Sequence, residues 1–212
     1  MELMLKIAIY ALPVIFAITL HEAAHGYVAR YFGDSTAYML GRVSVNPLRH
    51  IDPIGTILVP LVSLTLGGIL FGWAKPVPVN FNQLRDPKKD MFWVAVAGPA
   101  ANFVMIVFWA LLTKLATLMP DGGVSAPLEL MGIAGMQINA VIMVLNLLPL
   151  PPLDGGRIAV SLLPRDLSYQ FAKIEPYGMM ILVLLLFSSM LDRVVSPFTD
   201  GTVHAVGRFF GI

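Results

Sequence analysis

The stretch TLHEAAHGYVAR, residues 19–30, decides how the rest of the chain is interpreted. It continues an apolar run, residues 7–18, that contains no charged side chain, so it belongs to a segment typical of a membrane-spanning helix. In a helix, residues four apart lie on one face, so His21 and His25 can point at the same metal ion. Glu22 lies beside them, within reach of a water bound to that ion.

Two histidines and a glutamate at this spacing match the helical pattern that binds zinc, with the glutamate as general base. On a soluble helix the same residues are often only a solvated face. Within a bilayer, however, a carboxylate costs roughly 2.5–3.5 kcal/mol on insertion scales, so an ionisable group there indicates function. The apolar setting therefore favours a metal site.

The composition of the whole chain indicates an integral membrane protein. Of its 212 residues, 57% are hydrophobic and 13% are charged, and the mean hydropathy is +0.78, whereas soluble domains carry about 25% charged residues. A net charge of +1 without a basic block argues against a nucleic-acid partner. The chain has no cysteine, which excludes disulfides and leaves His, Asp and Glu as zinc ligands. The first apolar run lacks a small-residue cleavage site, so we do not expect a removable signal peptide.

We predict an all-α integral membrane protein with about four to six transmembrane helices in a single domain, residues 1–212. The expected membrane segments are 5–31, 54–72, 91–118, 133–150 and about 177–191. Alternating apolar and polar residues predict a short strand or hairpin at 38–45. Residues 119–132 are expected to form a Gly/Pro loop, and the tail after Asp192 an interfacial helix.

Charge asymmetry predicts the topology, because Lys and Arg in short loops mark the cytoplasmic side. Nearly all of the loop Lys and Arg lie in 30–53, 73–90 and 157–175. If 54–72 crossed the membrane once, the first two of these segments would lie on opposite sides, so a re-entrant pass is the more economical prediction. His21, His25 and Asp154 would then lie near the cytoplasmic ends of two inward-running segments, which places the active site towards the cytoplasm.

Asp154 is the predicted third zinc ligand, since a catalytic zinc commonly has three protein ligands and one open position. It follows a run rich in proline, residues 149–152, and precedes a Gly-Gly pair, so its backbone is irregular. Irregular backbone at membrane depth is tolerated where it is buried in protein or lines a cavity. The alternative is an Asp that caps a helix starting near Gly155. His50 and His204 are rival ligands, but both are expected at the surface.

A peptidase site also needs groups that bind the substrate. Glu22 would take a proton from the water and deliver it to the leaving amine. Asn102 and Asn146 are uncharged amides on apolar helices that could donate to the developing oxyanion, or could simply hydrogen-bond between helices. The edge-like segment Val77–Asn80 could hold a substrate strand by strand addition, with Asn80 as a further substrate-binding residue.

These motifs together resemble the site-2 protease family of intramembrane zinc metalloproteases. The sequence HEAAH at 21–25 is similar to the family's first motif, and NLLPLPPLDGG at 146–156 to its second, in which the Asp is the third zinc ligand. The run Gly98-Pro99-x-x-Asn102 also resembles a family element. The resemblance covers a catalytic core of about residues 7–160, leaving a C-terminal helix and tail at 177–212. It implies one Zn²⁺ and transmembrane protein substrates cut within or near the bilayer.

The chain resembles the compact members of the family, because it has no PDZ-like insertion or nucleotide-sensing domain, and we expect it in a prokaryotic cell membrane. Residues 54–72 are longer than the strand region expected there. A catalytically idle scaffold or chaperone of the same fold is an alternative, although the intact Glu22, His21 and His25 argue against it. A metal transporter is another, but it would not need Glu22. Zinc over other divalent metals follows from ligand type and family.

Overall fold

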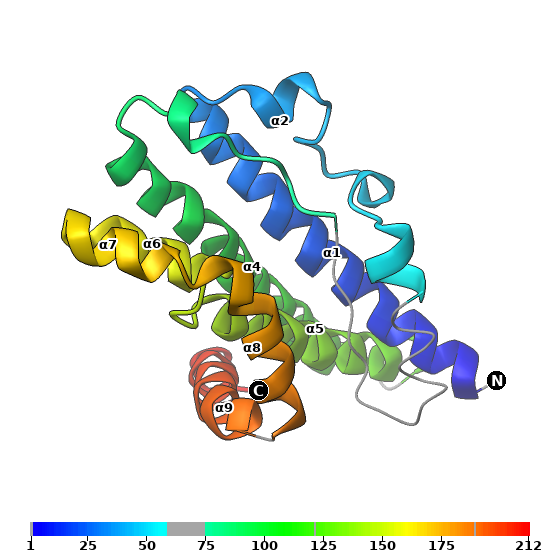
Figure 1. Ribbon diagram of the computed structural model, residues 1–212. Helices are drawn as coiled ribbons and strands as arrows, with labels where there is room; N and C mark the ends of the chain where they lie inside the picture. The colour runs from blue at the N-terminus through cyan, green and yellow to red at the C-terminus, as the bar shows by residue number, and fades with distance from the viewer. Residues whose placement is uncertain (1, 59–74, 121, 189) are drawn as a thin grey trace.

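The computed structural model describes residues 2–58, 75–120, 122–188 and 190–212, which form helices joined by turns and irregular chain (Figure 1). The longer helices are α1 (Glu2–Tyr31), α4 (Pro87–Thr117), α5 (Ser125–Asn146), α6 (Asp154–Leu162), α7 (Arg165–Ala172), α8 (Glu175–Phe187) and α9 (Met190–Phe210). Short helical turns are α2 (Thr36–Met39), η1 (Pro47–Arg49), η2 (Pro53–Leu58) and η3 (Phe81–Gln83). The described residues contain no strand.

Three long helices form the centre of the molecule. Helix α4 runs antiparallel to α1, and α5 runs back in the direction of α1 (Figure 1). Small residues let α5 approach α4 closely, because Gly135 lies against the Trp109 ring and Gly132 against Thr113. Helices α8 and α9 add Leu182 and Val195 to the same buried cluster. The bundle therefore holds α1, α4 and α5 in fixed register around their shared interior.

Helix α1 ends where the sequence predicts. Gly33 has a φ of 113°, a left-handed conformation that favours glycine, and the Asp34 N–H donates to the Ala29 carbonyl to close the last turn. Asp34 itself is fully buried. Its carboxylate accepts the Thr36 N–H at 2.9 Å and the Asn80 N–H at 2.7 Å. Asp34 therefore both closes the end of α1 and ties a distant loop to it.

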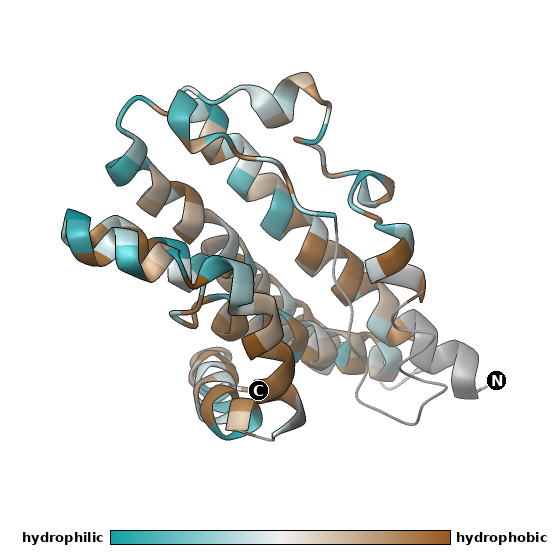
Figure 2. Cartoon of the chain, viewed as in Figure 1, coloured by the Kyte–Doolittle hydropathy of each residue, from teal (hydrophilic) through white to brown (hydrophobic). Residues whose placement is uncertain are grey.

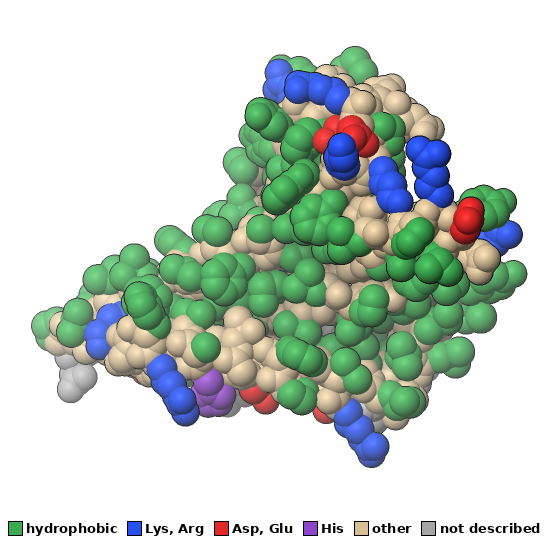
Figure 3. Space-filling model, turned by 90° about the vertical axis from the view of Figure 1, so that its left-hand side faces the viewer, with side chains coloured by type: hydrophobic (Ala, Val, Ile, Leu, Met, Phe, Trp, Pro, Cys, Tyr) green, Lys and Arg blue, Asp and Glu red, His purple; other side chains and the backbone are tan. Residues whose placement is uncertain are grey.

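The surface fits a membrane environment. By length and composition, α4 and α5 could each cross a bilayer, and the bent pair α8–α9 could make a third span, counting the described residues alone. In Figure 2, hydrophobic residues dominate the middle of the bundle, and hydrophilic residues lie mainly towards its ends and in α6 and α7. Figure 3 shows a band of hydrophobic side chains between charged groups over the upper part and the lower edge. The chain is an integral membrane protein.

Two predictions for the segments between the long helices are wrong. The expected hairpin at 38–45 is a helical turn, α2, followed by irregular chain, because Tyr38, Met39 and Leu40 are all exposed and the alternation did not mark a buried face. The expected loop at 119–132 is shorter, since α5 already begins at Ser125. The predicted re-entrant pass at 54–72 lies mostly outside the described residues.

The C-terminal part follows the predicted division into an apolar helix and a more polar one. Helix α8 covers most of the expected span but ends at Phe187, and α9, which already begins at Met190, follows it at an angle of 84°. Helix α9 packs along α5 and α4 (Figure 1). Its charged residues Asp192, Arg193 and Asp200 are exposed. The tail is therefore a long helix against the bundle.

Candidate metal centre

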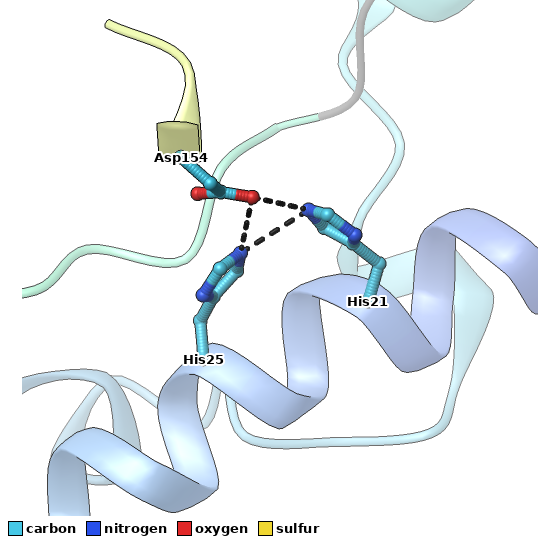
Figure 4. Close-up of side chains that lie close together, drawn as sticks. All are labelled: His21, His25 and Asp154. Carbon is cyan, nitrogen blue, oxygen red and sulfur yellow. Dashed lines mark hydrogen bonds and ion pairs between the residues drawn. The ribbon is translucent and has the colours of Figure 1, made fainter. Parts of the chain in front are cut away.

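Two elements far apart in the sequence bring three ligand-type side chains together (Figure 4). His21 and His25 lie one turn apart on the same face of α1, and both are buried. Asp154 lies in the first turn of α6. Its Oδ2 is 3.2 Å from His21 Nε2 and 3.4 Å from His25 Nε2. The structure thus places Asp154, the predicted third ligand, beside the two histidines.

Hydrogen bonds from the other ring nitrogen fix the tautomer of each histidine. The His21 Nδ1–H donates to Asn102 Oδ1 at 2.6 Å, and the His25 Nδ1–H donates to the Val94 carbonyl at 2.7 Å. A carbonyl can only accept, so His25 Nδ1 must carry the proton. The Asn102 amide nitrogen donates elsewhere, to the Ala17 carbonyl, which leaves its oxygen for His21. Both Nε2 lone pairs therefore face Asp154.

The convergence of these atoms fits a bound cation. The two Nε2 atoms are 3.1 Å apart, and neither carries a proton in the tautomers above. Asp154 Oδ2 is buried and receives no hydrogen bond. Three acceptors in contact repel one another unless a cation lies between them. Two imidazoles and a carboxylate are the ligand set of a catalytic zinc site with an open fourth position.

Helix α4 supplies the support behind the histidines. Val94, Gly98 and Asn102 recur every four residues and so lie on one face of α4. Gly98 lies directly against both rings, and a Cβ there would lie 2.7 Å from His21 Nε2. A side chain at this position would displace the imidazoles. The Gly-Pro-x-x-Asn run therefore provides both the space for the rings and one of their hydrogen-bond partners.

A second buried amide extends this support to α5. Asn102 Nδ2 donates to Asn139 Oδ1 at 2.9 Å, and Asn139 Nδ2 donates to the Gly135 carbonyl at 2.8 Å. Both side chains are completely buried. Each amide is oriented by the next, so the orientation of His21 is set by a chain that ends on the backbone of α5. Asn139 belongs to none of the sequence motifs that indicate the site.

The break between α5 and α6 positions Asp154. After Asn146 the chain turns through the proline-rich residues 147–153 and starts α6 at Asp154. Gly155 and Gly156 lie against the backbone of this turn, at Leu147 and Pro151, where a Cβ would clash. A carboxylate in the first turn of a helix is favoured by the helix dipole. The alternative of a helix-capping Asp is not found, because Leu153 occupies the N-cap position of α6, no side chain caps the helix, and Asp154 is its first residue.

Glu22 lies in the cavity beside the three residues and is held by a loop. Its Oε2 accepts the Val77 N–H at 2.7 Å. The cavity has a volume of about 140 Å³. Besides Glu22 and the three ligand-type residues, the cavity is lined by Pro76, Val77, Val79, Phe81, Val94, Ala95, Asn146, Pro152, Leu153 and Arg157. The prediction that Glu22 shares a site with His21 and His25 agrees with this geometry.

The three asparagines predicted to bind substrate lie in different surroundings. Asn146 lines the cavity and donates to the Ile142 carbonyl, leaving its side-chain oxygen without a partner among the described residues. Asn102 is buried behind His21 and hydrogen-bonds to it from another helix, which is the alternative to substrate binding. The Asn80 side chain accepts the Asn82 N–H and caps η3, outside the cavity lining.

The rival ligands lie away from this group of residues. His204 is exposed on α9. His50, expected at the surface, is buried, and its Nε2 hydrogen-bonds the Ser44 carbonyl at 2.8 Å. The carbonyl of His50 also accepts a hydrogen bond from the Lys75 N–H. In the described part of the chain, neither histidine joins a cluster of metal-ligand type.

Comparison with known proteins identifies the chain's family. A model of peptidase family M50 matches residues 111–189. A Bacillus subtilis protein named "Putative zinc metalloprotease YwhC" is 36% identical over 202 residues, which cover 94% of this chain and 89% of that protein. The chain belongs to peptidase family M50. The resemblance to site-2 proteases and the prediction of a metallopeptidase are thereby confirmed.

Further relatives of this M50 chain carry similar names. "Putative zinc metalloprotease Rip2" of Mycolicibacterium smegmatis is 32% identical over 84% of this chain and 66% of its own length. The protein of that name in Mycobacterium tuberculosis is 28% identical over 83% of this chain and 65% of its own length. No solved structure matches the chain. Zinc, the metal in these names, also suits the ligand set found in this M50 protein.

Proposed function

We propose that the chain is an intramembrane zinc endopeptidase that hydrolyses transmembrane protein substrates, with His21, His25 and Asp154 holding one Zn²⁺. The observation that carries this proposal is the buried convergence of three unprotonated ligand atoms beside Glu22. A bound zinc would supply Lewis acidity towards water and the scissile carbonyl. The domain is expected to be single, with a catalytic core at about residues 7–160.

The protein's own residues divide the remaining work. Glu22 acts as general base on the attacking water and returns the proton to the leaving amine. The Val77 N–H holds one Glu22 oxygen, so the other is free to face the water. Asn102 and Val94 keep the histidine Nε2 lone pairs turned inward. Asn146, at the cavity wall, is placed to hold the substrate backbone.

Strand addition by the 77–80 segment is restricted by the contacts that it already makes. The Val77 N–H is bonded to Glu22 and the Asn80 N–H to Asp34, while Pro78 has no N–H. Of the three N–H groups in this segment, that of Val79 alone meets no acceptor among the described residues. A substrate strand would therefore gain a single donor here, so we place substrate binding at Asn146 instead of Asn80.

The proposed topology has the site towards the cytoplasm and a re-entrant pass at 54–72. The hydrogen bond from Lys75 to the His50 carbonyl, 2.9 Å, supports this, because the chain entering the segment and the chain leaving it meet. Exposed aromatic residues near the end of α1 and the start of α4, Tyr27, Tyr31 and Trp93, are typical of a membrane interface. Counting α1 and the α8–α9 pair with α4 and α5 gives four spans, the lower end of the predicted number.

The proposal is tested with purified protein, zinc and a fluorescent transmembrane peptide, comparing wild type with Glu22→Gln. Wild type is expected to cut the peptide, and the variant to bind zinc without cutting. Equal cleavage by both would refute the role of Glu22. Zinc binding and peptide binding without cleavage by the wild type would favour a catalytically idle scaffold.

A further inference from the structure

Arg157 adds a positive charge to the wall of the metal cavity. It lies three residues after Asp154 in α6, so both side chains leave the same face of the helix. Its guanidinium carbon is 5.1 Å from the centre of the Phe81 ring. Phe81 begins η3, directly after the loop on the other side of the cavity, and both residues line the cavity together with the ligand-type side chains. Arg157 thus spans from α6 towards the loop that holds Glu22.

The donors of this guanidinium have no partner among the described residues. The structure gives the Arg157 side chain neither a hydrogen bond nor an ion pair there. Contact with an aromatic ring uses the positive charge of a guanidinium but none of its five N–H donors. By comparison, Arg42 donates to the Lys75 carbonyl and Arg85 to the Tyr31 carbonyl. Arg157 is therefore free to bind something that enters the cavity.

The charges of the residues around the cavity indicate which kind of ligand Arg157 binds. The tautomers of His21 and His25 are neutral, and Asp154 and Glu22 together carry two negative charges. One Zn²⁺ balances these two charges. Arg157 is then the one uncompensated charge among the described residues that line the cavity. In a low-dielectric site, an unpaired cation strongly favours an anionic ligand, and a guanidinium fork matches a carboxylate.

We propose that Arg157 binds a substrate carboxylate next to the scissile bond and so gives the peptidase a preference for acidic substrates at one subsite. The inference rests on the proposed peptidase function and adds a substrate class to it. The carboxylate can come from an Asp or Glu side chain or from a free C-terminus. The same charge disfavours Lys or Arg at that subsite.

The experiment uses full-length protein with zinc and a set of transmembrane peptides. Mass spectrometry first locates the bond cut in a parent peptide without acidic residues. Single Glu, Gln or Lys residues are then placed at each of the four positions on either side of that bond. A further pair ends just beyond the bond in either a free carboxylate or an amide. Binding is measured separately by fluorescence anisotropy with the Glu22→Gln variant.

At one position, Glu is expected to raise kcat/KM at least about tenfold over Gln, as a charge-assisted hydrogen bond allows, and Lys is expected to lower it. Anisotropy should show the same order in binding. If the free carboxylate gives the gain and no internal Glu does, the anion is the chain terminus. Equal kcat/KM and equal binding for Glu, Gln and Lys peptides at every position, and for acid and amide ends, would overturn the proposal.

Variants of Arg157 test the charge directly. Arg157→Gln should remove the Glu preference, Arg157→Lys should keep part of it, and Arg157→Glu should reverse it in favour of the Lys peptide. The matched control Arg165→Gln, on exposed α7, should keep the wild-type preference. A uniform loss of kcat on all peptides in Arg157→Gln, with no change in their order, would contradict substrate selection.

Failure of this inference is distinguishable from failure of the proposed function. If wild type cuts peptides but does not discriminate among them, the carboxylate proposal alone falls. If wild type with bound zinc cuts none of the peptides, the peptidase proposal itself falls. Zinc content, measured for every variant, shows whether a substitution has disturbed the metal centre instead of the subsite.

Discussion

At the residue scale, the candidate metal centre depends on side chains that do not themselves face the metal. His21 and His25 have lone pairs directed at Asp154 because Asn102 and the Val94 carbonyl take their other ring nitrogens. The ligand candidates and Glu22 could be predicted from the sequence, because their spacing and their apolar setting are unusual. Asn139 and Arg157 could not be, since one more Asn on an apolar helix or one more Arg after a motif carries no such signal.

Asn139→Ala should weaken zinc binding although Asn139 is remote from the metal. The substitution leaves Asn102 without the partner that orients it, so the His21 ring loses its fixed tautomer. Loss of a supporting hydrogen bond of this kind commonly costs 10–100-fold in metal affinity. Competition with a fluorescent zinc chelator measures the change. Gln137→Ala, at an exposed position on the same helix, serves as control. If the zinc affinity of Asn139→Ala equals that of the control, Asn139 does not orient His21 through Asn102.

Gly98→Ala should abolish zinc binding while leaving the fold intact. The added methyl would occupy the space of both imidazoles, and alanine otherwise favours a helix. Zinc content by mass spectrometry of the purified protein gives the result, with circular dichroism as a check on helicity. Gly201→Ala in α9, where a Cβ meets no atom within 4 Å, is the matched control. Normal zinc content in Gly98→Ala would show that α4 does not pack on the ligands as described.

At the scale of elements, the 75–80 loop connects the end of α1 to the cavity. Asp34 holds the loop at Asn80, and the loop holds Glu22 at Val77. Pro76 and Pro78 predicted an extended, edge-like segment here, and the structure indeed contains no helix at 75–80. The sequence could not predict that the loop's donors are used by one carboxylate from α1 and one from the turn after it, because those residues lie more than 40 positions away. The hairpin expected at 38–45 failed because alternation at an exposed turn carries no information about pairing.

Asp34→Ala should lower stability without removing the metal. The substitution leaves the Thr36 and Asn80 N–H groups without acceptors, at a cost of about 1–3 kcal/mol. Thermal unfolding in detergent should therefore show a midpoint about 2–10 °C lower. Zinc content should stay at the wild-type value because no ligand candidate lies on the loop. Asp200→Ala, exposed on α9, provides the comparison. Identical unfolding midpoints for both variants would mean that the Asp34 hydrogen bonds do not stabilise the fold.

At the scale of the whole molecule, the arrangement of α1, α4 and α5 brings the two motifs together. Helix α1 and helix α5 run in the same direction, so HEAAH near the end of one and the turn after the other reach a common depth (Figure 1). The loop charges predict a comparable depth for the two motifs. The two motifs are held together by the packing of α1 and α5 on α4. This packing depends on how individual side chains fit, so sequence patterns could not predict it.

The predicted topology can be checked by labelling single cysteines, because the chain has none of its own. Cysteines at Asn82 and Leu48, both exposed, should react with an impermeant reagent from the cytoplasmic side, and one at Val124 from the outside. Right-side-out and inverted vesicles provide the two conditions. Labelling of Asn82→Cys from the outside alone would mean that 54–72 crosses the membrane.

The central claim is that one zinc is bound by two histidines of α1 and the carboxylate of α6. X-ray absorption at the zinc edge of the purified protein tests it most directly, because imidazole scattering gives the number of histidine ligands. The expected result is one zinc per chain with two imidazoles and oxygen ligands at about 2.0–2.2 Å. A shell with three imidazoles, which would require His50 or His204, or an unchanged spectrum and zinc content in Asp154→Ala, would contradict it.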